Sequence, residues 1–407
     1  MPDEPTHTPA PPTRRTRRRT VLRVVLVSAL VLAVITGVAT YLFVRHLNGN
    51  IETGSLDELG PGRPERQYTG NGKPLNILVM GDDSRDGEGN RIDGEEGAGG
   101  SDTTILVHLS ADRSRAYAVS IPRDSIVDRP ACNDGETPAE TDVMWNEAFT
   151  LGDEFCTADQ FEQTTDILLD HYVVVDFNGF GQMVDAVEGV PVCVPEDIVD
   201  RPRQIFVPKG DPSVLSGDEA LDYFRARYVG DYEEQNDISR IRRQQEFIGA
   251  LVRKVKSAGT LARPDKVVRL LNAATRSLRT DEELGSVTRI ARIALQLQDI
   301  GLDKVQFVTL PTEYFPSDSE FRGKVRWTAD ADQIWDLLNH DRVLPASLIG
   351  DSSVDALGPG GSADSGDGEP STGTPSRIPS TPSGSPADPG DDGSGEAAEQ
   401  PVFGVCA

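Results

Sequence analysis

The chain has 407 residues and a formal net charge of -26. So acidic a chain is a poor candidate for nucleic-acid binding, because contacts with phosphate backbones need a surplus of Lys and Arg. Hydrophobic residues make up 37% of the sequence, which suffices for a full hydrophobic core, so any anion-binding site must be local.

The N-terminus combines a basic cluster with a long apolar segment. Five arginines lie between Arg14 and Arg19, and the 21 residues from Val24 to Val44 are almost all apolar. As a helix these would span roughly 31 Å, the thickness of a bilayer's hydrocarbon core. The positive-inside rule then predicts a cytoplasmic tail at residues 1–20, a transmembrane helix at 21–45 and an external remainder. A cleaved signal peptide is the alternative, but no small-residue cleavage pattern follows directly.

The rest of the chain divides by composition into three parts. Residues 46–72 are polar and rich in Gly and Pro, which predicts a short stalk that lifts the next domain off the lipid. Residues 73–345 are expected to form the folded domain. Residues 346–407 repeat Gly, Ser, Pro and Asp and are expected to be a disordered tail, because they hold too few large apolar residues to form a core.

Strand and helix patterns alternate through the folded part. Short β-branched runs between turn residues predict strands at 75–80, 103–109, 116–121 and 172–177. Apolar residues at helical spacing, with capping signals, predict helices at 178–187, 217–224 and 238–256. The alternation predicts an α/β domain with a mixed central sheet and helices packed on both faces.

Charged residues stand at the ends of the first three predicted strands. Asp83 follows the first strand, Asp102 directly precedes the second, and Arg123 follows the third. If the first two strands are antiparallel neighbours, all three residues lie at one edge of the sheet. Two carboxylates beside an arginine suit a hard cation such as Mg²⁺, whose coordination shell phosphate oxygens can complete. Each residue alone has an ordinary interpretation as a solvated turn or a local ion pair.

A second group supplies positive charge farther along the chain. Arg225 and Arg227 would point the same way in an extended segment after a helix, and Arg240 and Arg243 share a helix face. Guanidinium groups bind phosphate oxygens bidentately and remain charged at physiological pH. The cluster therefore predicts a pyrophosphate-binding site.

The chain holds four cysteines and five histidines. Cys132 and Cys156 flank one loop-rich stretch and could pair in an oxidising compartment, although buried free thiols are the alternative. The connectivity of Cys193 and Cys406 stays open. None of the histidines lies in the charged motifs, so we expect all five to be structural.

The order of these motifs resembles the LytR-CpsA-Psr family. The resemblance rests on residues 76–85, 101–106, 120–124, 171–180, 189–190, 225–227 and 237–245. It implies a phosphotransferase that takes a glycopolymer from an undecaprenyl-pyrophosphate carrier and attaches it to peptidoglycan through a phosphodiester bond. The implied location is a bacterial cell membrane, with a cytoplasmic N-terminus and an extracytoplasmic domain. A non-catalytic receptor for polyprenyl-pyrophosphate-linked intermediates is the alternative.

The resemblance also implies roles for individual residues. Carried over by motif position, Asp83 and Asp102 would hold magnesium (or manganese). The residues that would bind pyrophosphate, with Arg123 also in a catalytic role, are Arg123, Arg225, Arg227 and Arg240. Arg243 is a further candidate that could instead pair with Asp237 or Glu246.

The sequence departs from the family at one position. The family usually has an arginine just before the aspartate matched to Asp102, but here the residues are Gly99-Gly100-Ser101, at the end of a Gly- and Glu-rich insertion at 86–100. Arg85 or Arg91 could reach the site as a substitute. The general base is left unassigned.

Overall fold

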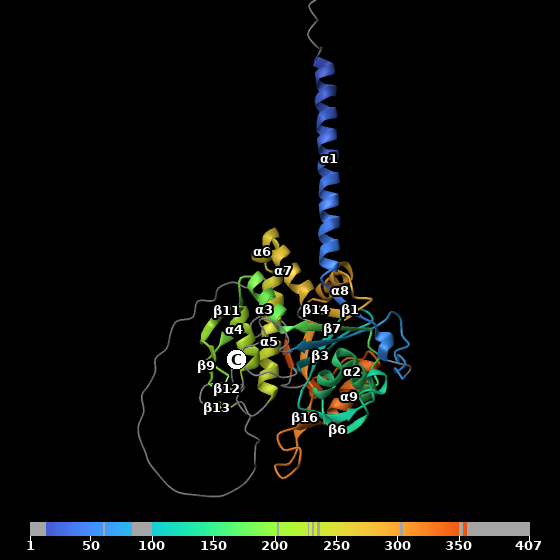
Figure 1. The fold of residues 1–407 in the computed structure, drawn as a ribbon, viewed down its shortest axis with the longest axis vertical. Helices are drawn as coiled ribbons and strands as arrows, with labels where there is room; N and C mark the ends of the chain where they lie inside the picture. Colours follow the sequence, from blue (N-terminus) through green and yellow to red (C-terminus); the bar gives the residue numbers. More distant parts are fainter. Residues whose placement is uncertain are drawn as a thin grey trace, which may run out of the picture.

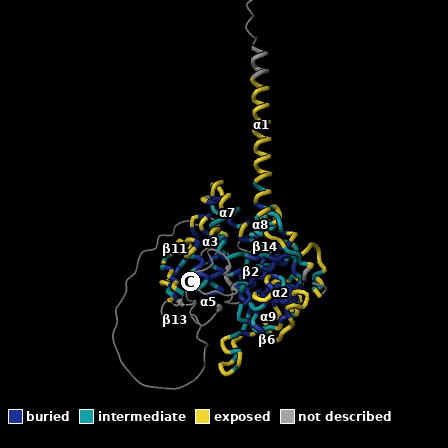
Figure 2. Tube along the Cα trace, viewed as in Figure 1, coloured by how far each residue is buried: buried dark blue, intermediate teal, exposed yellow. Residues whose placement is uncertain are grey.

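The computed structural model describes residues 14–59, 62–83, 100–201, 203–226, 228–229, 232–233, 237–301, 304–349 and 353–355. A long helix, α1 (Arg14–Asn48), stands away from an α/β domain (Figure 1). The segment Val21–Asn48 of α1 is long and apolar enough to cross a membrane, in agreement with the transmembrane helix predicted from the sequence. Most of α1 is exposed (Figure 2), which is what a segment surrounded by lipid requires.

The domain is built on an eight-stranded mixed sheet in the order β1-β14-β7-β2-β3-β4-β15-β18. Strands β2, β3 and β4 pair antiparallel, whereas β7 runs parallel to β2 and β15 parallel to β4. This mixed sheet confirms the predicted fold class. The strand bounds are β1 (Glu52–Gly54), β2 (Leu75–Asp82), β3 (Ser101–Leu109), β4 (Ala116–Ile121), β7 (His171–Asp176), β14 (Leu278–Asp281), β15 (Val305–Thr309) and β18 (Ser353–Asp355).

Helices cover both faces of the sheet. Because side chains alternate along a strand, Leu78 and Met80 pack on one face, in the cluster that also contains Trp145 and Trp335. Val79 and Ile105 pack on the other face, beneath α5. The helices are α2 (Glu147–Thr165), α3 (Phe177–Ala186), α4 (Gly217–Arg225), α5 (Asp237–Lys256), α6 (Ala258–Leu261), α7 (Pro264–Arg276), α8 (Val287–Ile300), α9 (Ala329–Asn339) and α10 (Ala346–Ile349).

Short two-stranded sheets and two 3-10 turns complete the described domain. Strands β8 and β11 pair antiparallel beside α4 and α5, where a second apolar cluster contains Tyr223 and Phe247. The bounds are β5 (Ile126–Arg129), β6 (Glu140–Met144), β8 (Val190–Val194), β9 (Ile198–Asp200), β10 (Ile205–Val207), β11 (Gly210–Leu215), β12 (Tyr228–Val229), β13 (Tyr232–Glu233), β16 (Thr312–Tyr314), β17 (Val325–Trp327), η1 (Leu56–Leu59) and η2 (Asn133–Gly135).

The segment expected to be a stalk is instead packed against the domain. Helix α1 ends on the domain. Leu47 is only 1% exposed, and the side-chain oxygen of Asn48 accepts a hydrogen bond from the backbone nitrogen of Val287. The side-chain amide of Asn50 donates to the hydroxyl of Thr275. Strand β1 then joins the main sheet by parallel pairing with β14.

Ion pairs hold the rest of that segment. Arg63 lies 2.7 Å from Glu162, and Arg66 lies 2.6 Å from Asp170. Gly49 and Gly62 therefore mark turns in a packed segment, and the domain begins near Leu47 rather than at residue 73. It also extends beyond residue 345, because α10 follows and β18 adds an edge strand beside β15.

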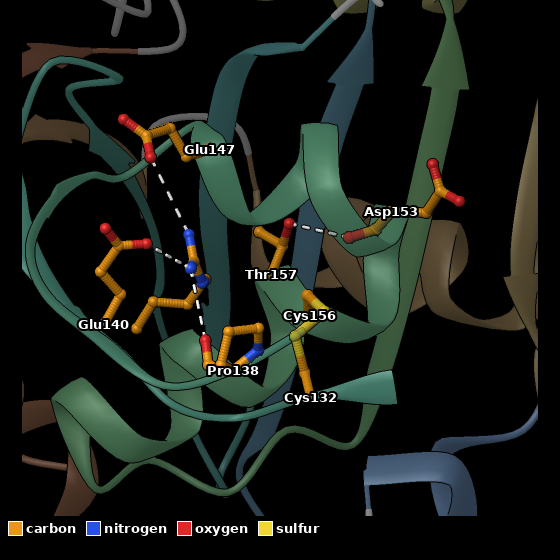
Figure 3. The surroundings of a disulfide bond; sticks show 8 residues. Cys132, Pro138, Glu140, Glu147, Asp153, Cys156 and Thr157 are labelled. Atoms are coloured by element: carbon orange, nitrogen blue, oxygen red, sulfur yellow. Dashed lines mark hydrogen bonds and ion pairs between the residues drawn. A yellow bond between two sulfur atoms is a disulfide. The ribbon is translucent and has the colours of Figure 1, made fainter. Parts of the chain in front are cut away.

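One predicted disulfide is present. Cys132 and Cys156 are bonded, with their Cα atoms 5.4 Å apart, which ties the loop after β5 to α2 (Figure 3). The bond meets α2 one turn after a kink at Gly152 and Asp153. Cys193 is also disulfide-bonded. Cys406 lies outside the described residues.

Candidate functional site

The ends of β2 and β3 bring two predicted site residues next to each other in the backbone. The register pairs Gly81 with Thr103 and Asp82 with Ser101, so Asp102 is the extra residue of a β-bulge. The backbone nitrogen of Asp83 donates to the carbonyl oxygen of Gly100 at 3.4 Å. The antiparallel pairing on which the sequence argument depended is thus present. The side chain of Asp102 lies outside what the structure describes.

Asp83 and Arg225 form the central ion pair of the site. Nη2 of Arg225 donates to Oδ1 of Asp83, although the two residues are 142 positions apart in the chain. Their side chains are only 13% and 19% exposed for Arg225 and Asp83, so water screens the pair less than it would at the surface. Cζ of Arg225 also lies 5.4 Å from the centre of the Phe177 ring, a cation–π contact that orients the guanidinium.

Helix α4 delivers Arg225 as its last residue. The helix begins with a capping box, in which Ser216 and Glu219 satisfy each other's backbone nitrogens, as the sequence predicted. After Arg225 the backbone turns extended at Ala226. The cap fixes the start of α4, and it therefore helps to fix the position of Arg225 at the end of α4.

Gly81 is required by the close approach of Phe177. A Cβ atom on Gly81 would lie 2.8 Å from Cε1 of Phe177, a distance that real Cβ atoms do not show. The missing side chain lets the Phe177 ring reach the end of β2, where it supports Arg225. The sequence carries no specific signal for this role of Phe177, because it is an aromatic residue at the start of a helix.

Arg123 follows β4, at the sheet edge where β2 ends and β3 begins. Its side chain is 13% exposed, and its Nε lies 3.8 Å from Oδ2 of Asp124. Oδ1 of Asp124 lies 3.1 Å from Nζ of Lys324. Lys324 adds a charge beside Arg123 that sequence reasoning missed, because it is 200 positions away from Asp124.

Helix α5 crosses the same edge of the sheet. Arg240 is 5% exposed, and one turn later Oε1 of Gln244 accepts a hydrogen bond from the hydroxyl of Thr103 at 3.3 Å. Nε2 of Gln245 donates to the hydroxyl of Ser120 at 2.8 Å. These contacts place the first half of α5 against the ends of β3 and β4. Gln244 is thereby a site residue that the sequence indicated only by its helical neighbours.

Arg243 is placed differently from the expectation that it binds pyrophosphate. It is fully buried, and its guanidinium donates to the carbonyl oxygens of Tyr223 and Ala226, both at 2.9 Å. The last carbonyls of a helix have no donor within that helix, so Arg243 satisfies those of α4. Its position therefore supports the segment that carries Arg225.

Asp82 and Asp83 point to opposite faces of the sheet, as neighbouring residues at a strand end do. Oδ2 of Asp82 lies 3.1 Å from Nη2 of Arg279, which also lies 3.2 Å from Glu154. Burial raises the pKa of Glu154, while the charge of Arg279 opposes that change. These ion pairs hold the end of β2 from the sheet face opposite to that of Asp83.

Two carboxyl groups near the arginines have raised pKa values. Burial raises the pKa of Asp222 to about 6, although Arg225, one turn along α4, opposes the change. Burial likewise raises the pKa of Glu246, on α5, to about 7, with Arg253 opposing. Both groups therefore titrate near neutral pH, close to the elements that form the site.

Three predicted site residues, Arg85, Arg91 and Arg227, lie outside the described residues. Within the part that the structure describes, no three His, Cys, Asp or Glu side chains come together as a metal site. Magnesium requires fewer protein ligands, since it typically takes one or two carboxylates and completes its shell with water and phosphate oxygens. Asp83 and the adjacent Asp102 fit that donor set.

The described part of the chain thus combines one apolar helix, long enough to cross a membrane, with an α/β domain whose sheet edge carries Asp83 and several arginines. The chain belongs to the LytR_cpsA_psr family, whose model matches residues 45–342.

Two curated relatives illustrate the family. The chain is 32% identical to "Cell wall biosynthesis protein LcpA" of Corynebacterium glutamicum over 322 residues, which cover 72% of this chain and 60% of that protein. It is 32% identical to "Polyisoprenyl-teichoic acid--peptidoglycan teichoic acid transferase TagV" of Bacillus subtilis, over 48% of this chain and 47% of that protein. The chain thus spans about half of the length of these relatives.

The fold is shared with solved structures of the family. The crystal structure of TagV from Bacillus subtilis matches with a TM-score of 0.50 at 24% identity, covering 68% of this chain and all of that chain. The LytR-Csp2A-Psr enzyme from Actinomyces oris matches with a TM-score of 0.52 at 15% identity, covering 71% and 96%.

Proposed function

We propose that the protein is a membrane-anchored phosphotransferase that moves a glycopolymer from a polyprenyl-pyrophosphate carrier to peptidoglycan during cell-wall assembly. The observation that carries the proposal is the half-buried pair of Asp83 and Arg225, at the sheet edge that also holds Asp102 and Arg123. The names of the relatives, a peptidoglycan teichoic acid transferase and a cell-wall biosynthesis protein, support the same chemistry.

The arginines would bind the pyrophosphate of the carrier. Arg225 pairs with Asp83, and a pyrophosphate would offer stronger, bidentate acceptors for the same guanidinium. Arg123 and Arg240 approach from the neighbouring strand end and helix. Arg85 and Arg227 are included in this proposal on the sequence resemblance alone.

Asp83 and Asp102 would hold a magnesium (or manganese) ion. When bound, the ion would help to neutralise negative charge on the pyrophosphate oxygens. Release of Arg225 to the substrate frees the carboxylate of Asp83 for this role, so ligand and metal binding support each other. No other metal-binding group is required for the proposed site.

The proposed reaction is a displacement at phosphorus. The acceptor hydroxyl oxygen of peptidoglycan bonds to the phosphorus nearest the sugar, the bond from that phosphorus to the bridging oxygen breaks, and polyprenyl phosphate leaves. The hydroxyl proton passes to a base that stays unassigned. Arg123 and Arg225 are placed to stabilise the charge that develops on the phosphoryl oxygens, which supplies much of the rate in phosphoryl transfer.

We also propose that the domain works outside the cytoplasm of a bacterial cell. The arginine-rich segment before Val21 would stay on the cytoplasmic side. The bond between Cys132 and Cys156 is consistent with this orientation, because disulfides persist in oxidising compartments.

The test measures release of polyprenyl phosphate from a lipid-pyrophosphate-linked saccharide by the full-length protein in detergent, with peptidoglycan and with or without Mg²⁺. We expect metal-dependent release by the wild type and a loss of about 100-fold or more in Asp83→Asn and Arg225→Lys. Arg326→Lys, at an exposed position of β17, is the matched control and should retain activity.

A receptor that binds lipid-linked intermediates without turnover is the second candidate, because Gly99-Gly100-Ser101 stand where the family usually has an arginine. Tight binding of the lipid substrate without any release, in the presence of acceptor and Mg²⁺, would favour the receptor. Release that is equal in the wild type and Asp83→Asn would contradict the proposed site.

A further inference from the structure

The end of α5, helix α6 and the start of α7 form the end of the domain on the same side as α1. In Figure 1, α6 reaches the height of the last turns of α1. The hydrogen bond from Asn50 to Thr275 joins the chain just after α1 to the last turn of α7. If α1 crosses a membrane, α6 lies at the surface of that membrane.

The sequence of this region is basic in an otherwise acidic chain. Residues 253–276 hold seven Lys or Arg and one acidic residue, Asp265, whereas the whole chain has a net charge of -26. Lys256 and Arg276 are exposed. Such a reversal of charge beside a membrane-spanning helix is typical of segments attracted to anionic lipid.

Acidic neighbours neutralise only part of this charge. Glu188 lies 2.8 Å from Lys266 and 3.7 Å from Arg263, and Asp265 lies 3.0 Å from Arg263 and 3.3 Å from Arg269. Two carboxylates thus serve three cations, so the surface stays positive.

Exposed apolar side chains lie among these cations. Leu261, the last residue of α6, is 59% exposed, Val268 on α7 is 41% exposed, and Val252 on α5 is 37% exposed. Apolar residues beside Lys and Arg are the combination found in protein segments that lie in the interface of a bilayer. Water is a poor environment for Leu261, and the boundary of the acyl chains is a better one.

We propose that this membrane-contact surface, formed by Val252, Lys256, Leu261, Arg263, Val268 and Arg269, docks on the anionic phospholipid headgroups of the bilayer that α1 crosses. The proposal goes beyond the transferase activity and rests on α1 as a membrane span. Leu261 enters the headgroup layer, while the cations contact lipid phosphates. Together with α1, this second attachment fixes the rotation of the domain about the helix axis.

The test places a fluorescent probe at the tip of α6. Full-length Leu261→Trp protein is reconstituted in nanodiscs of phosphatidylglycerol and phosphatidylcholine in equal parts, with brominated lipid as a shallow quencher. The three native tryptophans, measured in the wild type, give the background. We expect at least about twofold stronger quenching of the added tryptophan than of this background, and a weaker effect in phosphatidylcholine alone.

Charge-reversed variants separate headgroup attraction from mere proximity. Lys256→Glu with Arg269→Glu, both added to Leu261→Trp, should reduce the quenching by half or more. Arg322→Glu with Arg326→Glu is the matched control, since these exposed residues lie in and beside the loop between β16 and β17, at the other end of the domain (Figure 1).

Two results would overturn the proposal. Quenching at position 261 no stronger than in the wild type would exclude contact between α6 and the bilayer. Quenching that is equal in neutral and anionic nanodiscs, and unchanged by the charge reversal, would exclude recognition of anionic headgroups. Recovery of the protein in nanodiscs reports separately on α1, and activity assays report separately on the proposed transferase.

Discussion

At the scale of single residues, the position of Arg225 depends on several of its neighbours. Gly81 leaves room for Phe177, Phe177 supports Arg225, and Arg243 holds the carbonyls at the end of α4. Only Arg225 in this chain of contacts carries a charge that a substrate would meet. The others set where that charge lies.

Gly81→Ala should therefore reduce activity without unfolding the domain. The added methyl would lie 2.8 Å from the Phe177 ring and displace it, and with it Arg225. We expect a loss of roughly 10-fold or more in the release assay, because misplacement by about 1 Å is costly in catalysis. Gly37→Ala, which meets open space in α1, is the control. Full activity in Gly81→Ala would show that Phe177 does not position Arg225.

Arg243→Met should act on stability as well as on activity. The substitution removes two hydrogen bonds and leaves the buried carbonyls of Tyr223 and Ala226 without their donor. We expect the free energy of unfolding to fall by about 2–4 kcal/mol, which chemical denaturation in detergent would measure. Unchanged stability, with only weaker substrate binding, would return Arg243 to the group of pyrophosphate ligands.

Glu246 should make stability depend on pH near neutrality. Burial raises its pKa from 4.5 to about 7, so between these pH values the folded chain binds more protons than the unfolded chain. The free energy of unfolding therefore falls as pH rises through this window. Glu246→Gln should be about 1–2 kcal/mol more stable than the wild type at pH 8 and similar at pH 5.

Thermal unfolding of both proteins at the two pH values checks this expectation. Asp222, whose pKa is raised to about 6, contributes with the same sign in both proteins and cancels in the comparison. An equal difference in melting temperature at pH 5 and pH 8 would show that Glu246 is not the titrating group.

At the scale of elements, strand β1 shows how the chain after α1 stabilises the domain. It covers the edge of β14, and the ion pairs of Arg63 and Arg66 hold the following segment on α2 and β7. A truncated chain that begins at Lys73 would lose these contacts and expose β14 as an edge strand, which promotes aggregation. One that begins at Leu47 would keep them.

We expect the chain from residue 73 to melt at a temperature lower by about 5 °C or more than the chain from residue 47, and to form oligomers. A loss of about 2 kcal/mol is enough for such a shift in a domain of this size. Size-exclusion chromatography and thermal unfolding of the two chains test this. Equal melting temperatures would mean that residues 47–72 are dispensable for stability.

The elements that the sequence predicted well are those with a short-range signal. Ser216 and Glu219 marked the start of α4, and the runs from Leu75 and Ala116 marked β2 and β4. Strand β1 has only three residues and gains its stability from β14, more than 200 positions later, so no local pattern reveals it. The Gly and Pro residues around β1 indicated a linker, because the distant contacts that hold this segment leave no local pattern.

At the scale of the whole molecule, the order of the charged motifs predicted that the ends of neighbouring strands lie together. It did not predict the ion pairs formed by cations from distant segments of the chain. The antiparallel pairing of β2 with β3 was expected, and it brings residues 83 and 102 together. The approach of Lys324 to Asp124 and of Arg279 to Asp82 was not, because single cations in distant segments carry no signal of their destination.

The junction between α1 and the domain has a consequence for where the protein could act in the cell. Leu47 is buried and Asn48 is hydrogen-bonded to the start of α8, so α1 joins the described domain directly, without a flexible linker. If α1 spans a membrane as proposed, a domain held this way has a fixed height above that membrane. For the proposed transfer reaction, the acceptor would then have to come to the domain, so glycan strands beside the membrane would be within its reach and the outer layers of the wall would not.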